Sequence, residues 1–170
     1  LDLHGAAGSQ GWEQHSGCAE KNELWACEEN RNRTIWLWEQ IADHYRDRPE
    51  VAAYGLLNEP WGTTPQEMAS FLWELFDATR AVDDRHMIVL AGHSQGIDAY
   101  GDPSMRENTS NVALEMHFYP GYWGWRDEDP PVEVQNEWLH CNIADHVIGW
   151  QRQTVCEWDL KMTGLRTPFF

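Results

Sequence analysis

The feature that most constrains the fold is a regular alternation of short apolar runs with longer segments of helical periodicity. Short apolar runs bounded by turn residues are typical of strands, whereas apolar residues that recur every three to four positions are typical of helices. The alternation predicts βαβ units and therefore a parallel sheet. We expect strands at residues 1–4, 51–57, 86–91, 111–116 and 154–156, and helices at residues 34–47, 65–82 and 132–149.

Two of the expected helices are clearly amphipathic. The helix at 65–82 starts with Pro65, which is tolerated in the first turn because the N–H there has no partner within the helix. Both segments place apolar residues on one face and polar residues on the other. The apolar face comprises Ile35, Trp38, Ile41, Ala42 and Tyr45 in the first, and Met68, Phe71, Leu72, Leu75, Phe76 and Thr79 in the second.

The segments that follow the expected strands are rich in polar and aromatic residues. In a (β/α)8 barrel all these segments lie at the C-terminal face, where active sites are found. Five strands cannot close a barrel of eight. We therefore expect an α/β fold, an incomplete (β/α)8 TIM barrel with about five of its eight units. Residues 1–170 would be a single domain cut at both ends, since the chain starts and stops within apolar runs. In isolation this piece is expected to be poorly folded or inactive, because an open sheet exposes its edges.

The composition narrows the classes of partner. The net charge is −16, which repels phosphate backbones and argues against nucleic acid. No apolar run approaches the ~20 residues that span a bilayer, so no membrane partner is expected. The chain has 11 Trp, and several lie among turn residues. A single Trp is more often a core residue, but the group suggests flat stacking surfaces for sugar rings. Trp61, Trp123 and Trp125 are candidate platforms or, equally, covers of the barrel rim.

Two carboxylates stand at the ends of expected strands. Glu59 follows residues 51–57 within Asn58-Glu59-Pro60, and Glu157 follows residues 154–156. A strand-end Glu can also cap the next helix, which is an equally good interpretation of Glu59 taken alone. Two carboxylates at one rim, however, are what glycoside hydrolysis needs. One protonates the leaving oxygen, and the other attacks the anomeric carbon across roughly 5–5.5 Å in retaining enzymes.

Four segments together resemble glycoside hydrolase family 5, the cellulase-like retaining barrels. They occur in the family's order and at plausible spacing over nearly the whole chain. The segments are Leu1 to Gln10 (LDLHGAAGSQ), Gly55 to Pro60 (GLLNEP), Met116 to Pro120 (MHFYP) and Val155 to Trp158 (VCEW).

The resemblance implies that the chain covers roughly barrel strands three to seven of a retaining β-glycosidase. Glu59 would be the acid/base on the fourth strand, and Glu157 the nucleophile on the seventh. Asn58 would hydrogen-bond the 2-hydroxyl of the sugar in the −1 subsite. Cys156 departs from the small residue usual before the nucleophile, and two further family residues, an Arg and a Trp, fall outside the sequence.

Three more residues receive roles through the resemblance. His4 and His117 would line the −1 subsite, and Tyr119 would orient the nucleophile. The likeness of residues 1–10 to exo-acting β-glucanases favours a β-glucan-type polysaccharide or oligosaccharide, while linkage and endo or exo action stay open. Secretion or a cell-surface location is expected from the substrate class. Nothing in the sequence calls for a metal or organic cofactor, and the oligomeric state is not readable.

One different enzyme class competes. Gly92-His93-Ser94-Gln95-Gly96 matches the G-x-S-x-G nucleophile elbow of α/β-hydrolase esterases, with Ser94 as nucleophile. That elbow must begin a helix, yet residues 97–103 contain Gly and Pro and are turn-like. A Trp-rich carbohydrate-binding module is a weaker alternative, because such modules are usually β-sandwiches with few helices.

The cysteines leave one question open. No C-x-x-C pair or H-E-x-x-H motif is present, so zinc is not expected. Cys18 and Cys27 lie in one long loop. They could form a disulfide in an oxidising compartment, or be free thiols.

Overall fold

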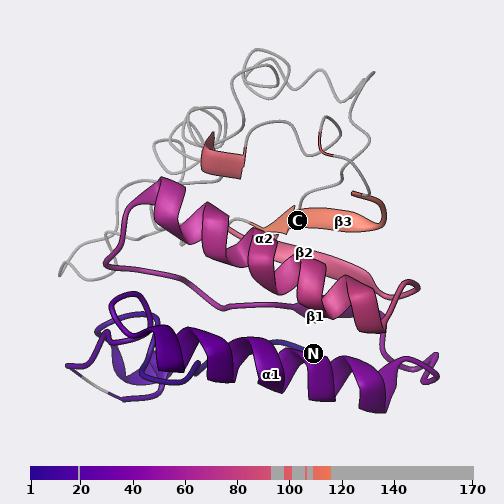
Figure 1. Cartoon of the computed structure of the whole chain (residues 1–170), viewed down its shortest axis with the longest axis horizontal. Helices are drawn as coiled ribbons and strands as arrows, with labels where there is room; N and C mark the ends of the chain where they lie inside the picture. Colours follow the sequence, from indigo (N-terminus) through magenta and orange to yellow (C-terminus); the bar gives the residue numbers. More distant parts are fainter. Residues whose placement is uncertain (19, 93–97, 101–105, 107–108, 116–170) are drawn as a thin grey trace, which may run out of the picture.

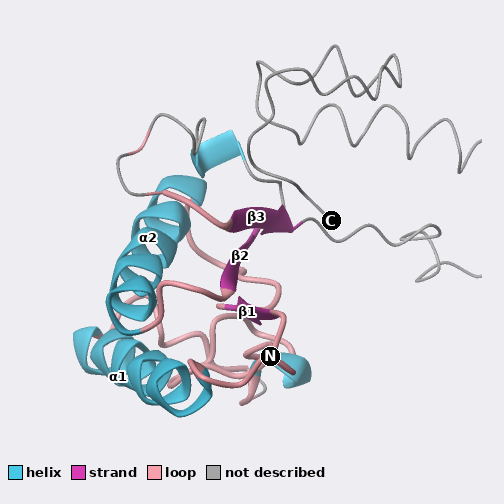
Figure 2. Cartoon of the chain, turned by 90° about the vertical axis from the view of Figure 1, so that its right-hand side faces the viewer, coloured by secondary structure: helices cyan, strands magenta, loops and turns pink. Residues whose placement is uncertain are grey.

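The computed structural model describes residues 1–18, 20–92, 98–100, 106 and 109–115. Within them a three-stranded parallel sheet runs in sequential order through β1 (Ala53–Gly55), β2 (Met87–Ala91) and β3 (Val112–Glu115). Two helices, α1 (Glu28–Tyr45) and α2 (Pro65–Val82), lie side by side on one face of this sheet (Figures 1 and 2). The short 3-10 helices η1 (Gln14–Ser16) and η2 (Asp98–Tyr100) lie in connecting segments. The predicted alternation of strand and helix is confirmed over this part of the chain.

The first residues of the chain extend the sheet. Asp2 pairs in parallel with Gly55, and the N–H of Leu3 donates to the carbonyl of Gly55 at 3.1 Å. The N–H of Asn58 in turn donates to the carbonyl of Leu3 at 3.0 Å. The expected strand at residues 1–4 therefore exists as an extended segment beside β1, although its pairing is short. The spatial order is residues 1–3, β1, β2 and β3, as consecutive units of a barrel require.

Helix α2 has the predicted bounds. Thr64 is its N-cap, with its hydroxyl accepting from the N–H of Glu67 at 3.1 Å, and Pro65 follows in the first turn. All six residues predicted for its apolar face are buried. Helix α1 begins earlier than predicted, at Glu28 instead of Thr34. Residues 28–33 are all polar, so apolar periodicity could not reveal this turn and a half.

The strands are shorter than the apolar runs that predicted them. The run at 51–57 gives only β1, the run at 86–91 loses one residue, and β3 starts at Val112 instead of Asn111. Beyond β1, Leu56 still donates to the carbonyl of Val89 at 3.2 Å before the chain turns at Asn58. The elements expected at 132–149 and 154–156 lie outside the described residues.

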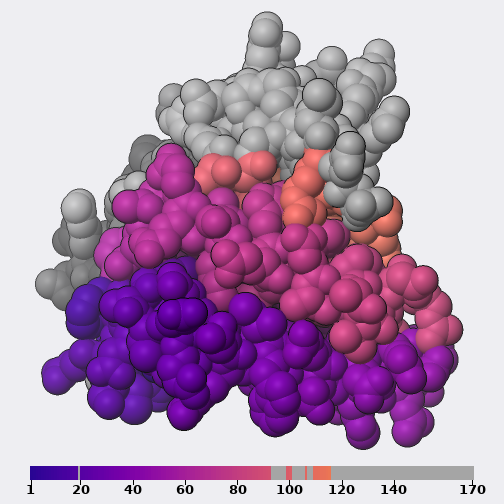
Figure 3. Space-filling model, in the orientation of Figure 1, coloured from indigo at the N-terminus to yellow at the C-terminus, as the bar shows by residue number. Residues whose placement is uncertain are grey.

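The core fills the space between the helices and the sheet. The strand residues that face the helices are almost wholly inaccessible to solvent, and the side chains of α1 and α2 form one continuous surface over them (Figure 3). Trp38 on α1 spans this layer, since its indole N–H donates to the carbonyl of Leu56 at 2.9 Å. The core includes Leu56, just after β1, and four strand residues, Tyr54, Ile88, Leu90 and Leu114. With its helices on one face, the sheet has the layering of a barrel segment.

Candidate active site

Asn58 and Glu59 lie at the carboxyl end of β1, as predicted. Leu56 and Leu57 just before them are buried, and Asn58 is only 4% exposed. The side chain of Glu59 is 24% exposed, so its carboxyl group reaches the rim of the sheet but is partly shielded. The sequence at this point changes from apolar to polar within one residue, which places the carboxyl group where the strand ends.

The backbone at Glu59 is strained. Its φ is +43°, a region that residues other than glycine seldom occupy. Pro60 follows, and a proline further restricts the residue before it. Such strain costs on the order of 1–3 kcal/mol and persists where the surrounding structure enforces it, commonly at functional sites. The conformation turns the chain sharply away from the strand at the residue that carries the candidate acid/base.

Gln10 holds the two strand ends together, and sequence reasoning did not single it out. Its buried side-chain N–H group donates to the carbonyl of His4 at 2.8 Å and to the carbonyl of Asn58 at 2.9 Å. Its side-chain oxygen accepts from the N–H of Ala6 at 3.0 Å. One amide therefore fixes the backbones of two predicted site residues relative to each other. Its only sequence signal was its place at the end of the first family-like segment.

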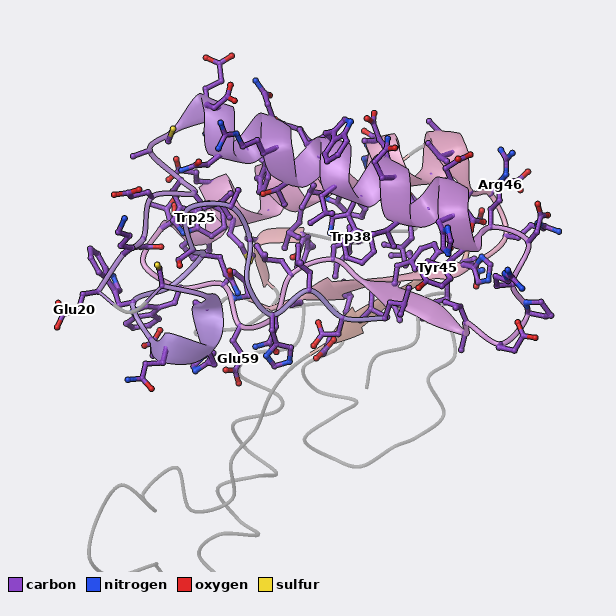
Figure 4. The ribbon with its side chains drawn as sticks, turned by 90° about the horizontal axis from the view of Figure 1, so that it is seen from below. Glu20, Trp25, Trp38, Tyr45, Arg46 and Glu59 are labelled. Carbon is purple, nitrogen blue, oxygen red and sulfur yellow. The ribbon has the colours of Figure 1, made fainter. Side chains whose placement is uncertain are left out.

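His4 lies at the end of the extended segment beside β1, next to the strand end that carries Asn58. Its side chain is 61% exposed, and its Nε2 lies 2.7 Å from a carboxylate oxygen of Asp2. The structure thus brings His4, Asn58 and Glu59 to the same edge of the sheet. In Figure 4 Glu59 lies toward the opposite end of the molecule from Tyr45 and Arg46, where α1 ends.

His15 contacts the candidate acid/base directly and was not predicted. Its Nε2 lies 3.0 Å from Oε2 of Glu59. His15 belongs to η1, in the loop after the first extended segment. No spacing or motif in the sequence marks it, because the contact joins residues far apart in the chain.

Two exposed tryptophans stand near this edge. Trp12 is 52% and Trp61 is 40% exposed. The N–H of Trp61 donates to the carbonyl of Gln10 at 2.9 Å. A side chain at Gly62 would lie 2.8 Å from the indole nitrogen of Trp12, so the two loops approach closely. The exposure of Trp61 suits a sugar platform, which stays a prediction.

Several predicted residues lie outside the described part of the chain. These include the candidate nucleophile, two further subsite residues, the esterase serine and the other candidate platforms. Their roles stay predictions, as does the separation of the two carboxyl groups. The residues concerned are Glu157, His117, Tyr119, Ser94, Trp123 and Trp125.

Three further features concern metal ligands, cysteines and membrane-spanning helices. Within the described residues no cluster of three or more His, Cys, Asp or Glu side chains could hold a metal ion. Cys18 and Cys27 are not bonded to each other in the structure. The described helices include none long and apolar enough to cross a membrane.

Comparison with known proteins defines the class. The structure resembles Cel5A of Thermotoga maritima solved with mannotriose, with a TM-score of 0.59 and 25% identity over 78% of this chain and 48% of that one. A second structure, the endoglucanase Cel5A from the same organism, gives a TM-score of 0.58 and 26% identity over 86% and 49%. The fold is accordingly part of a (β/α)8 barrel. The family model of cellulases, glycosyl hydrolase family 5, matches residues 1–154, and the chain belongs to this family.

Curated relatives agree with this assignment. A β-xylosidase of Phanerodontia chrysosporium is 36% identical over 124 residues, which is 70% of this chain and 25% of that protein. A glucan 1,3-β-glucosidase of Blumeria graminis is 29% identical over 70% of this chain and 28% of its own length. The chain thus spans only about a quarter of these proteins. Membership of the glycosidase family also decides against the esterase alternative.

Proposed function

We propose that the protein is a retaining β-glycosidase in which Glu59 is the acid/base and Glu157 the nucleophile. The observation that carries the proposal is the position of Asn58 and Glu59 at the carboxyl end of β1, with the Glu59 carboxyl partly exposed at the rim. Active sites of (β/α)8 barrels lie at this end of the strands. Family membership supplies the reaction class.

The reaction has two steps. Glu59 protonates the glycosidic oxygen while Glu157 attacks the anomeric carbon, which breaks the glycosidic bond and forms a glycosyl-enzyme. Glu59, now a carboxylate, then removes a proton from water as the water attacks the same carbon, which breaks the bond to Glu157 and releases its carboxylate. Asn58 would hydrogen-bond the 2-hydroxyl, and its backbone is already fixed by Leu3 and Gln10. His4, His117 and Tyr119 would complete the −1 subsite.

The substrate we propose is a β-linked polysaccharide or oligosaccharide of the β-glucan type. The named relatives include a glucan 1,3-β-glucosidase and a β-xylosidase, and Cel5A was solved with mannotriose and with cellobiose. A polymer of this kind is degraded outside the cell, so we also propose that the protein is secreted or held at the cell surface.

The test uses the full-length protein and a panel of cello-, laminari-, manno- and xylo-oligosaccharides. Proton NMR during the first turnovers should show a product whose anomeric configuration is retained. Glu157→Gln and Asn58→Ala should each nearly abolish turnover, whereas Glu74→Gln on the exposed face of α2 should not. An inverted product would remove the nucleophile role of Glu157, and failure to cleave any of the panel would overturn the proposal.

A further inference from the structure

The contact between His15 and Glu59 joins two loops that follow neighbouring strand ends. Nε2 of His15 lies 3.0 Å from Oε2 of Glu59, which is a normal hydrogen-bond length. The imidazole is 44% exposed and the carboxyl side chain 24%, so the pair lies at the surface of the rim instead of in the core. An imidazole that carries its proton on Nε2 can donate to Oε2 of Glu59, whether the carboxyl group is ionised or carries its own proton on Oε1. Either protonation state of Glu59 can therefore keep the contact.

The loop that carries His15 is tightly folded back on itself. The hydroxyl oxygen of Ser9 accepts from the N–H of Cys18 at 2.7 Å, which closes the loop across its base. Gly17 has a φ of +111°, and its Cα would lie 3.2 Å from a Cβ added at Gly5. Ser16, next to His15, is fully buried. The imidazole of His15 therefore extends from a turn that is held by a hydrogen bond and by close packing.

The contact with His15 is made to Oε2 of Glu59. A general acid must present its other oxygen to the glycosidic oxygen, within about 2.6–3.2 Å, in a fixed orientation. A glutamate has three side-chain torsions, and its last one is broad. The strained backbone at Glu59 fixes where its side chain starts, and the contact with His15 constrains the tip of that side chain.

We propose that His15 is a positioning residue for the acid/base: it holds Oε2 of Glu59 so that Oε1 faces the leaving group. The inference rests on the proposed function of Glu59 and adds a residue to it. Because His15 acts through Glu59, it should affect the rate only for substrates whose leaving group must be protonated. Its removal should leave substrates with acidic leaving groups almost unaffected.

The experiment compares His15→Ala, His15→Gln and wild type in the full-length enzyme. The substrates are the phenyl and 2,4-dinitrophenyl β-glycosides of the sugar cleaved in the oligosaccharide panel. For His15→Ala, kcat/KM on the phenyl glycoside should fall about tenfold or more, which corresponds to the loss of one charge-assisted hydrogen bond. On the dinitrophenyl glycoside kcat/KM should fall less than about twofold. His15→Gln keeps an N–H near the same place and should restore most of the loss. His44→Ala, at an exposed site in the last turn of α1, is the matched control and should behave as wild type.

Each outcome is decisive. Equal losses on both substrates would show a merely structural role and overturn the inference, as would unchanged kinetics in His15→Ala. If His15→Ala proves unstable, His15→Gln still tests the inference. The ratio of kcat/KM on the phenyl glycoside to kcat/KM on the dinitrophenyl glycoside is then compared between His15→Gln and wild type. A rescue that fails lowers kcat/KM on the phenyl glycoside alone. Wild type that cleaves neither glycoside would instead overturn the proposed function itself. If activity is lost in Glu59→Ala but unchanged in His15→Ala, only this inference is overturned and the proposed function stands.

Discussion

The two ends of the strand layer are built in opposite ways. At the carboxyl end of β1, Glu59 and its partner His15 are partly exposed, and the backbone of Glu59 is strained. At the amino end, the hydroxyl of Tyr54 donates to Oδ2 of Asp83 at 2.8 Å within the core. Nδ1 of His86 lies 2.5 Å from the same oxygen, and its Nε2 lies 3.1 Å from the carbonyl of Arg48. One end keeps polar groups accessible, while the other buries and pairs them.

Arg80 extends the network at the amino end. From α2 its guanidinium donates to the carbonyls of Asp83 and His86, and to those of Ser110 and Asn111 just before β3. One side chain therefore connects the end of α2 with the starts of two strands. Burial lowers the pKa of Arg80, which Asp83 and Asp84 partly offset.

The carboxyl group of Asp83 is extensively hydrogen-bonded at this end. Burial alone would raise its pKa. Hydrogen bonds from the N–H of Arg85, the hydroxyl of Tyr54, and the N–H and ring of His86 outweigh burial and lower the pKa to about 2. Burial and the hydrogen bond to Asp83 raise the pKa of Tyr54 in turn. In barrels the amino end stabilises the fold and the carboxyl end carries function, and the proposed roles of Asn58 and Glu59 fit that division.

The largest expected effect is on activity at the carboxyl end. Glu59→Gln should lower kcat/KM on an unactivated oligosaccharide by about 100- to 10,000-fold, because it removes the proton donor. Its unfolding free energy should change by less than about 1 kcal/mol, since the side chain is partly exposed. Steady-state kinetics and urea unfolding of the full-length protein measure the two. An activity loss below tenfold would contradict the acid/base role.

The mirror experiment is Asp83→Asn at the amino end. It should lower the unfolding free energy by about 2–4 kcal/mol, because the amide replaces a buried carboxylate and the charge-assisted hydrogen bonds to that carboxylate are weakened or lost. The kcat of the folded fraction should stay within about twofold of wild type, since the site lies at the other end of the strands. Urea unfolding and kinetics are compared with Asp84→Asn, the exposed neighbour. Equal effects of the two variants on stability would contradict the division between the ends.

A smaller effect follows from the pKa of Asp83 in acid. The pKa is lowered from 3.8 in the unfolded chain to about 2 in the fold, so the ionised group stabilises the folded state above pH 4. That contribution, about 2 kcal/mol, is lost as the pH falls from about 4 to about 2. Unfolding free energies measured over this range should therefore fall more steeply for wild type than for Asp83→Asn. Parallel curves would show that Asp83 is not the group responsible.

The same division explains what the sequence could predict. The alternation of strands and helices, the bounds of α2 and the position of Glu59 follow from periodicity and from the abrupt polar change after Leu57. Residues 28–33 of α1 were missed because polar residues carry no periodic signal. Gln10 and His15 were missed for another reason. Their partners are distant in sequence, and a contact between two loops depends on turns such as those at Gly17 and Glu59, whose geometry no local pattern specifies.

The smallest effect isolates the backbone strain at Glu59. Glu59→Gly should be more stable than Glu59→Ala by about 1 kcal/mol, because glycine alone adopts a φ of +43° without a steric penalty. Both variants lack the carboxyl group and should be equally inactive on unactivated substrates. The same pair at Glu74, an exposed position within α2, is the matched control. There the sign should reverse, since glycine destabilises a helix interior by about 1 kcal/mol relative to alanine. If Glu59→Ala were the more stable of its pair, the strain would not exist, and the carboxyl end would differ from the amino end only in exposure.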